Sequence, residues 1–134
     1  MIQSTSAKKI LVVDDNEAHR YVITKILSKR GVEVCQASSG KEALENVDCS
    51  PDLILMDIHL PDMTAYTVLE KLRREEQTRD LPVILMSAVE PAPHARNTAA
   101  SFGVRSFLTL PVIPDDLWIV IEATMHRKKT RQAG

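Results

Sequence analysis

The segment KILVVDD, residues 9–15, begins at Lys9 and is then apolar without a break until it stops at two acids, Asp14 and Asp15. A β-branched run without polar alternation predicts a strand that is buried on both faces. The residues that follow it predict a helix over 17–29, which Gly31 ends. The apolar positions expected to form the one buried stripe of this helix are Ala18, Tyr21, Val22, Ile26 and Leu27.

The same alternation of strand and helix continues along the chain. Further strands are predicted over residues 32–37, 52–57, 81–86 and 105–110, and further helices over 39–51, 65–76, 92–102 and 114–126. Strands that alternate with helices pair in parallel, because each right-handed crossover needs a long connection. We therefore expect an α/β fold in which helices cover both faces of a five-stranded parallel sheet.

Composition narrows the class of protein. The chain has 134 residues, enough for one domain, with 17 basic against 18 acidic side chains and a formal charge of −1. This balanced charge gives no overall positive field that would attract nucleic acid or a membrane surface. No apolar run approaches the roughly 20 residues that span a bilayer. We expect a single cytoplasmic domain over residues 1–134, and reduced thiols at Cys35 and Cys49.

Polar residues follow the predicted strands at one edge of the sheet. Asp14 and Asp15 follow the first strand, Asp57 ends the third, and Ser87 follows the fourth. In an open parallel sheet, ligands bind beyond these carboxyl ends. Three carboxylates that lie close together repel one another, and a hard cation such as Mg²⁺ offsets that repulsion. An acid at a strand end taken alone is also an ordinary helix N-cap.

Asp57 is the best-placed nucleophile of this group. A carboxylate beside bound Mg²⁺ can attack a phosphoryl group when the charge that develops on the phosphoryl oxygens is neutralised. The Ser87 hydroxyl is a candidate donor to that group, and Ala88 leaves the approach open. A hydroxyl at a strand end is by itself a weak signal.

These segments resemble the receiver domain of two-component response regulators over about residues 8–127. The matching motifs are ILVVDDN, LILMDIHLPDM, PVILMSA and SFLTLP. The resemblance implies a flavodoxin-like, doubly wound sheet with strand order 2-1-3-4-5. It also implies transfer of a phosphoryl group to Asp57 from a histidine kinase, a phosphotransfer protein or a small phosphodonor.

The resemblance assigns roles at the site as well. Asp15, Asp57 and the backbone carbonyl of His59 would bind Mg²⁺, and Asp14 would orient metal-bound water. Ser87 would move toward the phosphoryl group, and Phe107 stands at the aromatic position whose rotamer follows that movement. His59 is equally readable as an ordinary loop histidine. Enzymatic activity would extend at most to self-phosphorylation and autodephosphorylation.

One position departs from the family. The lysine expected before the proline that follows the fifth strand is here Leu110, and Arg105 lies too far upstream to replace it. An ammonium on the phosphate would contribute about 1.5 to 3 kcal/mol. The sequence therefore predicts a phosphorylatable receiver with weakened switching. The alternative is a pseudo-receiver, a protein-binding module that acts without phosphorylation, and an aspartyl phosphatase is a distant third.

The last predicted helix is more apolar than one face requires. Its expected inward stripe is Leu117, Val120, Ile121 and Thr124. Trp118 and Ile119 lie outside that stripe. This favours one of two arrangements: these residues contact a downstream partner or a second copy in a homodimer, or Trp118 folds over the sheet edge. The basic tail, residues 127–134, is expected to complement the helix end rather than to bind nucleic acid.

Overall fold

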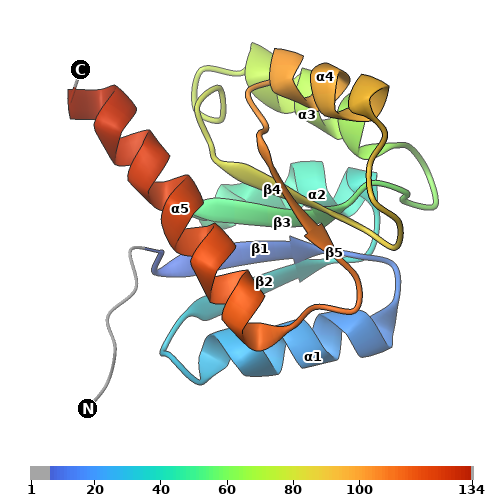
Figure 1. Cartoon of the computed structure of the whole chain (residues 1–134), viewed down its shortest axis with the longest axis vertical. Coiled ribbons are helices and arrows are strands. Elements are labelled where there is room, and N and C mark those ends of the chain that lie inside the picture. Colours follow the sequence, from blue (N-terminus) through green and yellow to red (C-terminus); the bar gives the residue numbers. More distant parts are fainter. Residues whose placement is uncertain (1–6, 134) are drawn as a thin grey trace.

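The computed structural model describes the backbone of residues 7–133 and the side chains of residues 7–126. A parallel sheet stands at the centre, with α1 and α5 on one face and α2, α3 and α4 on the other (Figure 1). The strand order is β2-β1-β3-β4-β5, as predicted. The strands are β1 (Lys9–Val13), β2 (Glu33–Ala37), β3 (Leu53–Asp57), β4 (Val83–Ser87) and β5 (Ser106–Thr109).

The helices follow the predicted order with small shifts at their ends. They are α1 (Glu17–Ser28), α2 (Gly40–Asn46) with the 3-10 turn η1 (Val47–Cys49), α3 (Ala65–Arg74), α4 (Pro93–Ser101) and α5 (Pro114–Ala133). The last helix continues past the predicted end at residue 126. The side chains of the expected basic tail lie outside the described residues. No helix among the described residues is both long enough and apolar enough to cross a membrane.

Two apolar cores stabilise the sheet from opposite faces. Alternate residues of each strand point into each core, so that β1 gives Ile10 and Val12 to one core and Leu11 and Val13 to the other. The side chains of these four residues are fully buried. Burial on both faces explains why the strands read as continuous apolar runs.

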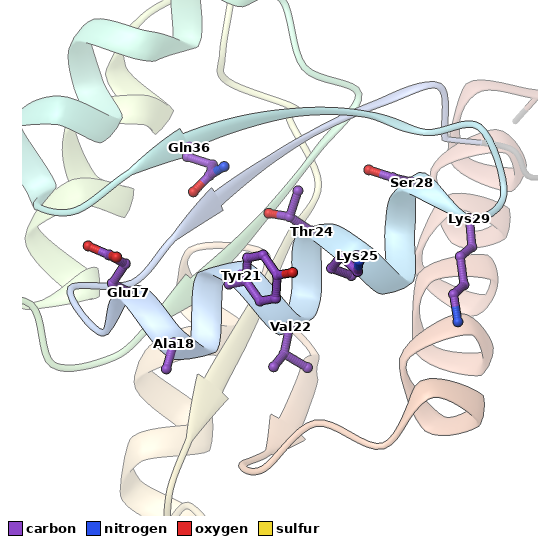
Figure 2. Close-up of a pocket in the computed structure, with 9 residues that line it drawn as sticks. All are labelled: Glu17, Ala18, Tyr21, Val22, Thr24, Lys25, Ser28, Lys29 and Gln36. Carbon is purple, nitrogen blue, oxygen red and sulfur yellow. The ribbon is translucent and has the colours of Figure 1, made fainter.

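The buried face of α1 differs from the predicted one. Ile23 and Leu27, four residues apart, are the buried apolar side chains, and Ile26 packs beside them. Tyr21 is 62% exposed and Val22 49% exposed. The predicted stripe is therefore confirmed at Ile26 and Leu27, but it omitted Ile23 and included residues on the solvent side. Tyr21 and Val22, with Gln36 of β2, are among the residues that line an open groove of about 880 Å³ along α1. Figure 2 shows the side chains of these residues.

The inward face of α5 is wider than predicted. Leu117, Ile121 and Thr124 are buried and Val120 packs against the same core, as expected. Trp118 is also buried, at 7% exposure, with the Arg30 guanidinium 4.3 Å from its ring centroid. Of the two alternatives left open for Trp118, the exposed residue available to a partner is therefore wrong. Its side chain belongs to the core formed with α1 and α5, and Ile119 alone of this pair is exposed.

Candidate functional site

The acids expected at the carboxyl edge of the sheet lie there in the structure. Asp57 is the last residue of β3 and pairs in register with Met86, one residue before Ser87. Asp14 directly follows β1, and its amide donates to the carbonyl of Ala37 at the end of β2. The parallel register therefore brings the ends of four neighbouring strands to one edge.

Asp14 is fully buried at this edge. Its Oδ1 accepts a hydrogen bond from the amide of Asn16 at 2.9 Å, and Arg20 donates to its backbone carbonyl at 2.7 Å. Nδ1 of His19 lies 3.3 Å from Oδ2 of Asp14, although neither atom has a hydrogen-bond partner of good geometry. A buried carboxylate oxygen is thus left without a hydrogen-bond donor.

The carboxylate of Asp57 is half-buried, and its Oδ1 accepts a hydrogen bond from the amide of His59 at 2.9 Å. Burial raises the pKa of Asp57, and repulsion from Asp14 and Asp15 raises it further. The His59 amide acts in the opposite direction. Asp14 and Asp15 thus both act on the carboxylate of Asp57, and Asp15 lies on the exposed side of this group of acids.

This group of acids suits a hard cation that takes few of its ligands from protein side chains. The unsatisfied Oδ2 of Asp14 and the mutual repulsion at Asp57 both mark uncompensated negative charge. Among the described residues, no three His, Cys, Asp or Glu side chains converge closely enough to hold a metal by themselves. Mg²⁺ binds through one or two carboxylates and keeps several waters. The residues fit such a partly hydrated ion rather than a cage made of side chains.

Ser87 is buried at the end of β4, beside the strand that leads to Leu110. Its Oγ accepts a hydrogen bond from the amide of Val89 at 3.3 Å, and its carbonyl accepts one from the amide of Leu110 at 2.8 Å. The Leu110 side chain packs against the core formed with α1 and α5. An aliphatic group therefore follows β5 where the family resemblance leads one to expect a cation.

Phe107 of β5 is half-buried and packs against the core on the side of α2, α3 and α4. The guanidinium of Arg96, from α4, lies 4.8 Å from the centroid of its ring. Arg96 also forms an ion pair with Glu90, in the loop that follows β4. This arginine thus links the loop after Ser87 to the aromatic side chain on β5.

The loop after Asp57 is bound to α2 by Asp62. The two carboxylate oxygens of Asp62 accept hydrogen bonds from the amides of Gly40 at 2.9 Å and Lys41 at 3.0 Å, and these bonds lower the pKa of Asp62. A Cβ at position 40 would meet Cγ of Met63 at 2.5 Å, so a larger residue there would require the Met63 side chain to move.

Sequence reasoning missed the contacts made by His19 and Asp62. A signal existed for His19, which lies in the first turn of the helix that begins after Asp14 and Asp15. Such a turn returns toward the strand end. No local signal existed for Asp62, because its partners lie 21 and 22 residues away.

Comparisons with known proteins agree with this geometry. The family model for the response regulator receiver domain matches residues 10–122. The two-component response regulator ORR5 of Oryza sativa subsp. japonica is 33% identical over 118 residues, which cover 87% of this chain and 87% of that protein. ORR7 of the same plant is 34% identical over 110 residues, 81% of this chain, and the match spans only 52% of the length of ORR7.

A solved structure shares the fold. The CheY-like response regulator receiver domain protein from Methanospirillum hungatei JF-1 superposes with a TM-score of 0.82 at 28% identity. The superposition covers 94% of this chain and 99% of that one.

Proposed function

Because the chain belongs to the family of response regulator receiver domains of two-component signalling, we propose that it accepts a phosphoryl group on Asp57 in a Mg²⁺-dependent reaction. The observation that carries the proposal is the electrostatic coupling of Asp57 to Asp14 and Asp15 at the carboxyl edge of the sheet. The donor is a histidine kinase or a phosphotransfer protein, and acetyl phosphate is a small substitute for it.

Asp57 is the nucleophile in this proposal. The amide of His59 binds Oδ1 and fixes the plane of the carboxylate, which leaves Oδ2 to attack the phosphorus. The bond from phosphorus to the donor nitrogen, or to the acetate oxygen, breaks as the bond to Oδ2 forms. The product is an acyl phosphate on Asp57, and the leaving group takes the electron pair of the broken bond.

The cation would be held by Asp15, Asp57 and the carbonyl oxygen of His59, while Asp14 would orient water bound to it. When bound, Mg²⁺ supplies positive charge that neutralises the phosphoryl oxygens and the three acids together. The buried, unsatisfied Oδ2 of Asp14 supports this assignment, because it has room for a hydrogen bond from such a water.

Ser87 donates its hydroxyl to a phosphoryl oxygen. Its Oγ accepts a hydrogen bond from Val89, so its own proton is available for donation. The ring of Phe107 responds to the movement of Ser87 in this proposal. The link between them is the contact of the ring with Arg96 and the ion pair of Arg96 with Glu90.

Switching is weakened in this proposal because Leu110 supplies no positive charge to the phosphoryl group. The packing of Leu110 in the core also favours a second candidate function, a pseudo-receiver that binds proteins without phosphorylation. Either form would contact a downstream protein or a second copy through the exposed face of α5, which presents Ile119.

Intact-mass measurement separates the two candidates. The protein is incubated with acetyl phosphate and Mg²⁺, in parallel with the Asp57→Asn variant and with a sample that contains EDTA. We expect the mass of one phosphoryl group on the wild type only, and only with Mg²⁺. A wild type that gains no mass under conditions that phosphorylate a typical receiver favours the pseudo-receiver.

A further inference from the structure

The segment between β3 and α3 is a tight turn over residues 58–65. The amide of Ala65 donates a hydrogen bond to the carbonyl of Ile58 at 2.9 Å, and the amide of Leu60 donates one to the carbonyl of Met63 at 3.3 Å. These two bonds hold the two sides of the turn together. We therefore expect the turn to change its orientation as one unit rather than residue by residue.

His59 lies inside this turn, opposite Thr64 in an isolated antiparallel bridge. Its amide donates to Oδ1 of Asp57 at 2.9 Å. Neither of the two bonds across the turn uses the carbonyl of His59, which is the group assigned to Mg²⁺ in the proposed function. The direction of this carbonyl therefore depends on how the whole turn is oriented.

Two contacts fix the tip of the turn against α2. The carboxylate of Asp62 accepts hydrogen bonds from the amides of Gly40 at 2.9 Å and Lys41 at 3.0 Å. The negative charge of Asp62 also lies at the start of the helix, where it is stabilising. The side chain of Met63 covers Gly40 so closely that a Cβ there would meet its Cγ at 2.5 Å. The tip of the turn thus has a charged contact and an apolar contact with the same helix.

The helix α2 has further contacts that do not involve Asp62. Oγ of Ser39 accepts a hydrogen bond from the amide of Glu42 at 3.1 Å, and the carboxylate of Glu42 accepts one from the amide of Ser38 at 2.8 Å. Ala43 is buried in the core on this face of the sheet. Loss of the Asp62 bonds would therefore free the turn more than it would disturb the helix.

We propose that Asp62 is a positioning residue for the cation: by binding the turn to α2, it fixes the orientation of the turn in which the carbonyl of His59 binds Mg²⁺. This inference rests on the proposed function. Without the bonds of Asp62, the acids at the strand ends would keep their places, but the carbonyl of His59 would sample several directions. Part of the free energy of metal binding would then be spent on ordering the turn, and the affinity for Mg²⁺ would fall.

The test is a titration of the folded protein with Mg²⁺, followed through the chemical shifts of its backbone amides. We expect Asp62→Ala to raise the dissociation constant about tenfold or more, the effect typical of losing a group that orients a metal ligand. Asp62→Asn keeps one acceptor oxygen and should lie between Asp62→Ala and the wild type. At saturating Mg²⁺, acetyl phosphate should phosphorylate Asp62→Ala nearly as fast as the wild type, because only the affinity for the ion is reduced.

Asp52→Ala is the matched control. Oδ2 of Asp52 accepts hydrogen bonds from the amides of Lys8 at 2.9 Å and Lys9 at 3.0 Å, where β1 and β3 begin, at the opposite edge of the sheet from the acids. Both alanine variants thus lose two bonds between a carboxylate and backbone amides, and urea unfolding should show a loss of stability in both. Only Asp62→Ala should bind Mg²⁺ more weakly than the wild type.

Two results would overturn the inference: an affinity of Asp62→Ala for Mg²⁺ equal to that of the wild type, or an equal loss of affinity in Asp52→Ala. Should Asp62→Ala fail to fold, the comparison of Asp62→Asn with Asp52→Asn decides in the same way. These results leave the proposed function untouched. A wild type that binds no Mg²⁺ would instead refute the Mg²⁺-dependent reaction itself, and the role of Asp62 with it.

Discussion

The amide of Leu110 donates a hydrogen bond to the carbonyl of Ser87 over 2.8 Å. This bond extends the pairing of β4 and β5 by one residue beyond Ser87 and Thr109. It therefore fixes an aliphatic side chain next to the strand end that carries the proposed phosphoryl-binding hydroxyl. The backbone holds residue 110 beside the site. The site lacks a positive charge at this position only because the side chain is that of leucine.

Substitution of that side chain should change the reaction rate. We expect Leu110→Lys to accelerate phosphorylation by acetyl phosphate about tenfold or more, because a charge-assisted bond to the phosphoryl group contributes about 1.5 to 3 kcal/mol. Leu110→Met is the control, since it keeps an apolar side chain of similar size. The rates come from intact mass against time. Equal rates in the two variants would remove the explanation of weakened switching.

Removal of the charge on Asp57 should stabilise the metal-free protein. In EDTA we expect Asp57→Asn to raise the free energy of unfolding, because the cost of burying the charge and the repulsion from Asp14 and Asp15 both end. Since water screens the half-exposed group, the gain is at most about 1 kcal/mol. Added Mg²⁺ should then stabilise the wild type more than the variant. Urea unfolding with and without Mg²⁺ measures both effects. A variant less stable than the wild type in EDTA would refute the repulsion.

The contact of Asp62 with α2 predicts a pH dependence. Because hydrogen bonds lower the pKa of Asp62 in the folded state, its contribution to stability is complete above the ordinary carboxyl value of 3.8 and is lost as the pH falls through the lower folded value. We expect Asp62→Asn to be less stable than the wild type at neutral pH, with the difference shrinking below pH 3.8. Urea unfolding across this range tests it, with the exposed Asp48→Asn as control. A difference in stability that stays constant with pH would show that the charge of Asp62 does not contribute to it.

Two adjacent residues of α5 should behave differently. Trp118→Ala should cost about 3 to 5 kcal/mol of unfolding free energy, because it empties a core position and removes the contact with Arg30. Ile119→Ala should change the free energy by no more than about 0.5 kcal/mol, because Ile119 is exposed. Chemical denaturation of the two variants decides this. Similar values for both would mean that α5 is rotated from the orientation described.

The sequence predicted the sheet well because each strand carries its own signal. The runs that end at Val13 and Asp57 are apolar throughout and stop at an acid, so both the strands and the edge to which the acids belong could be inferred locally. Strand order came from the resemblance to receivers, since no local pattern distinguishes one order of parallel strands from another.

The errors lie where burial depends on a distant partner. Tyr21 and Val22 are apolar but face solvent, because the sheet takes up the face with Ile23 and Leu27. Trp118 is buried in the core that α1 and α5 share, and an arginine 88 positions earlier in the chain lies over its ring.

The most direct test of the account locates the acyl phosphate itself. Protein treated with acetyl phosphate and Mg²⁺ is reduced with borohydride, which converts a phosphorylated aspartate into homoserine, and the peptides are then sequenced by mass spectrometry. The account predicts homoserine at position 57 and at no other aspartate, and none in the EDTA sample. Homoserine at Asp14 or Asp15, or unmodified Asp57 in a protein that has gained a phosphoryl mass, would contradict it.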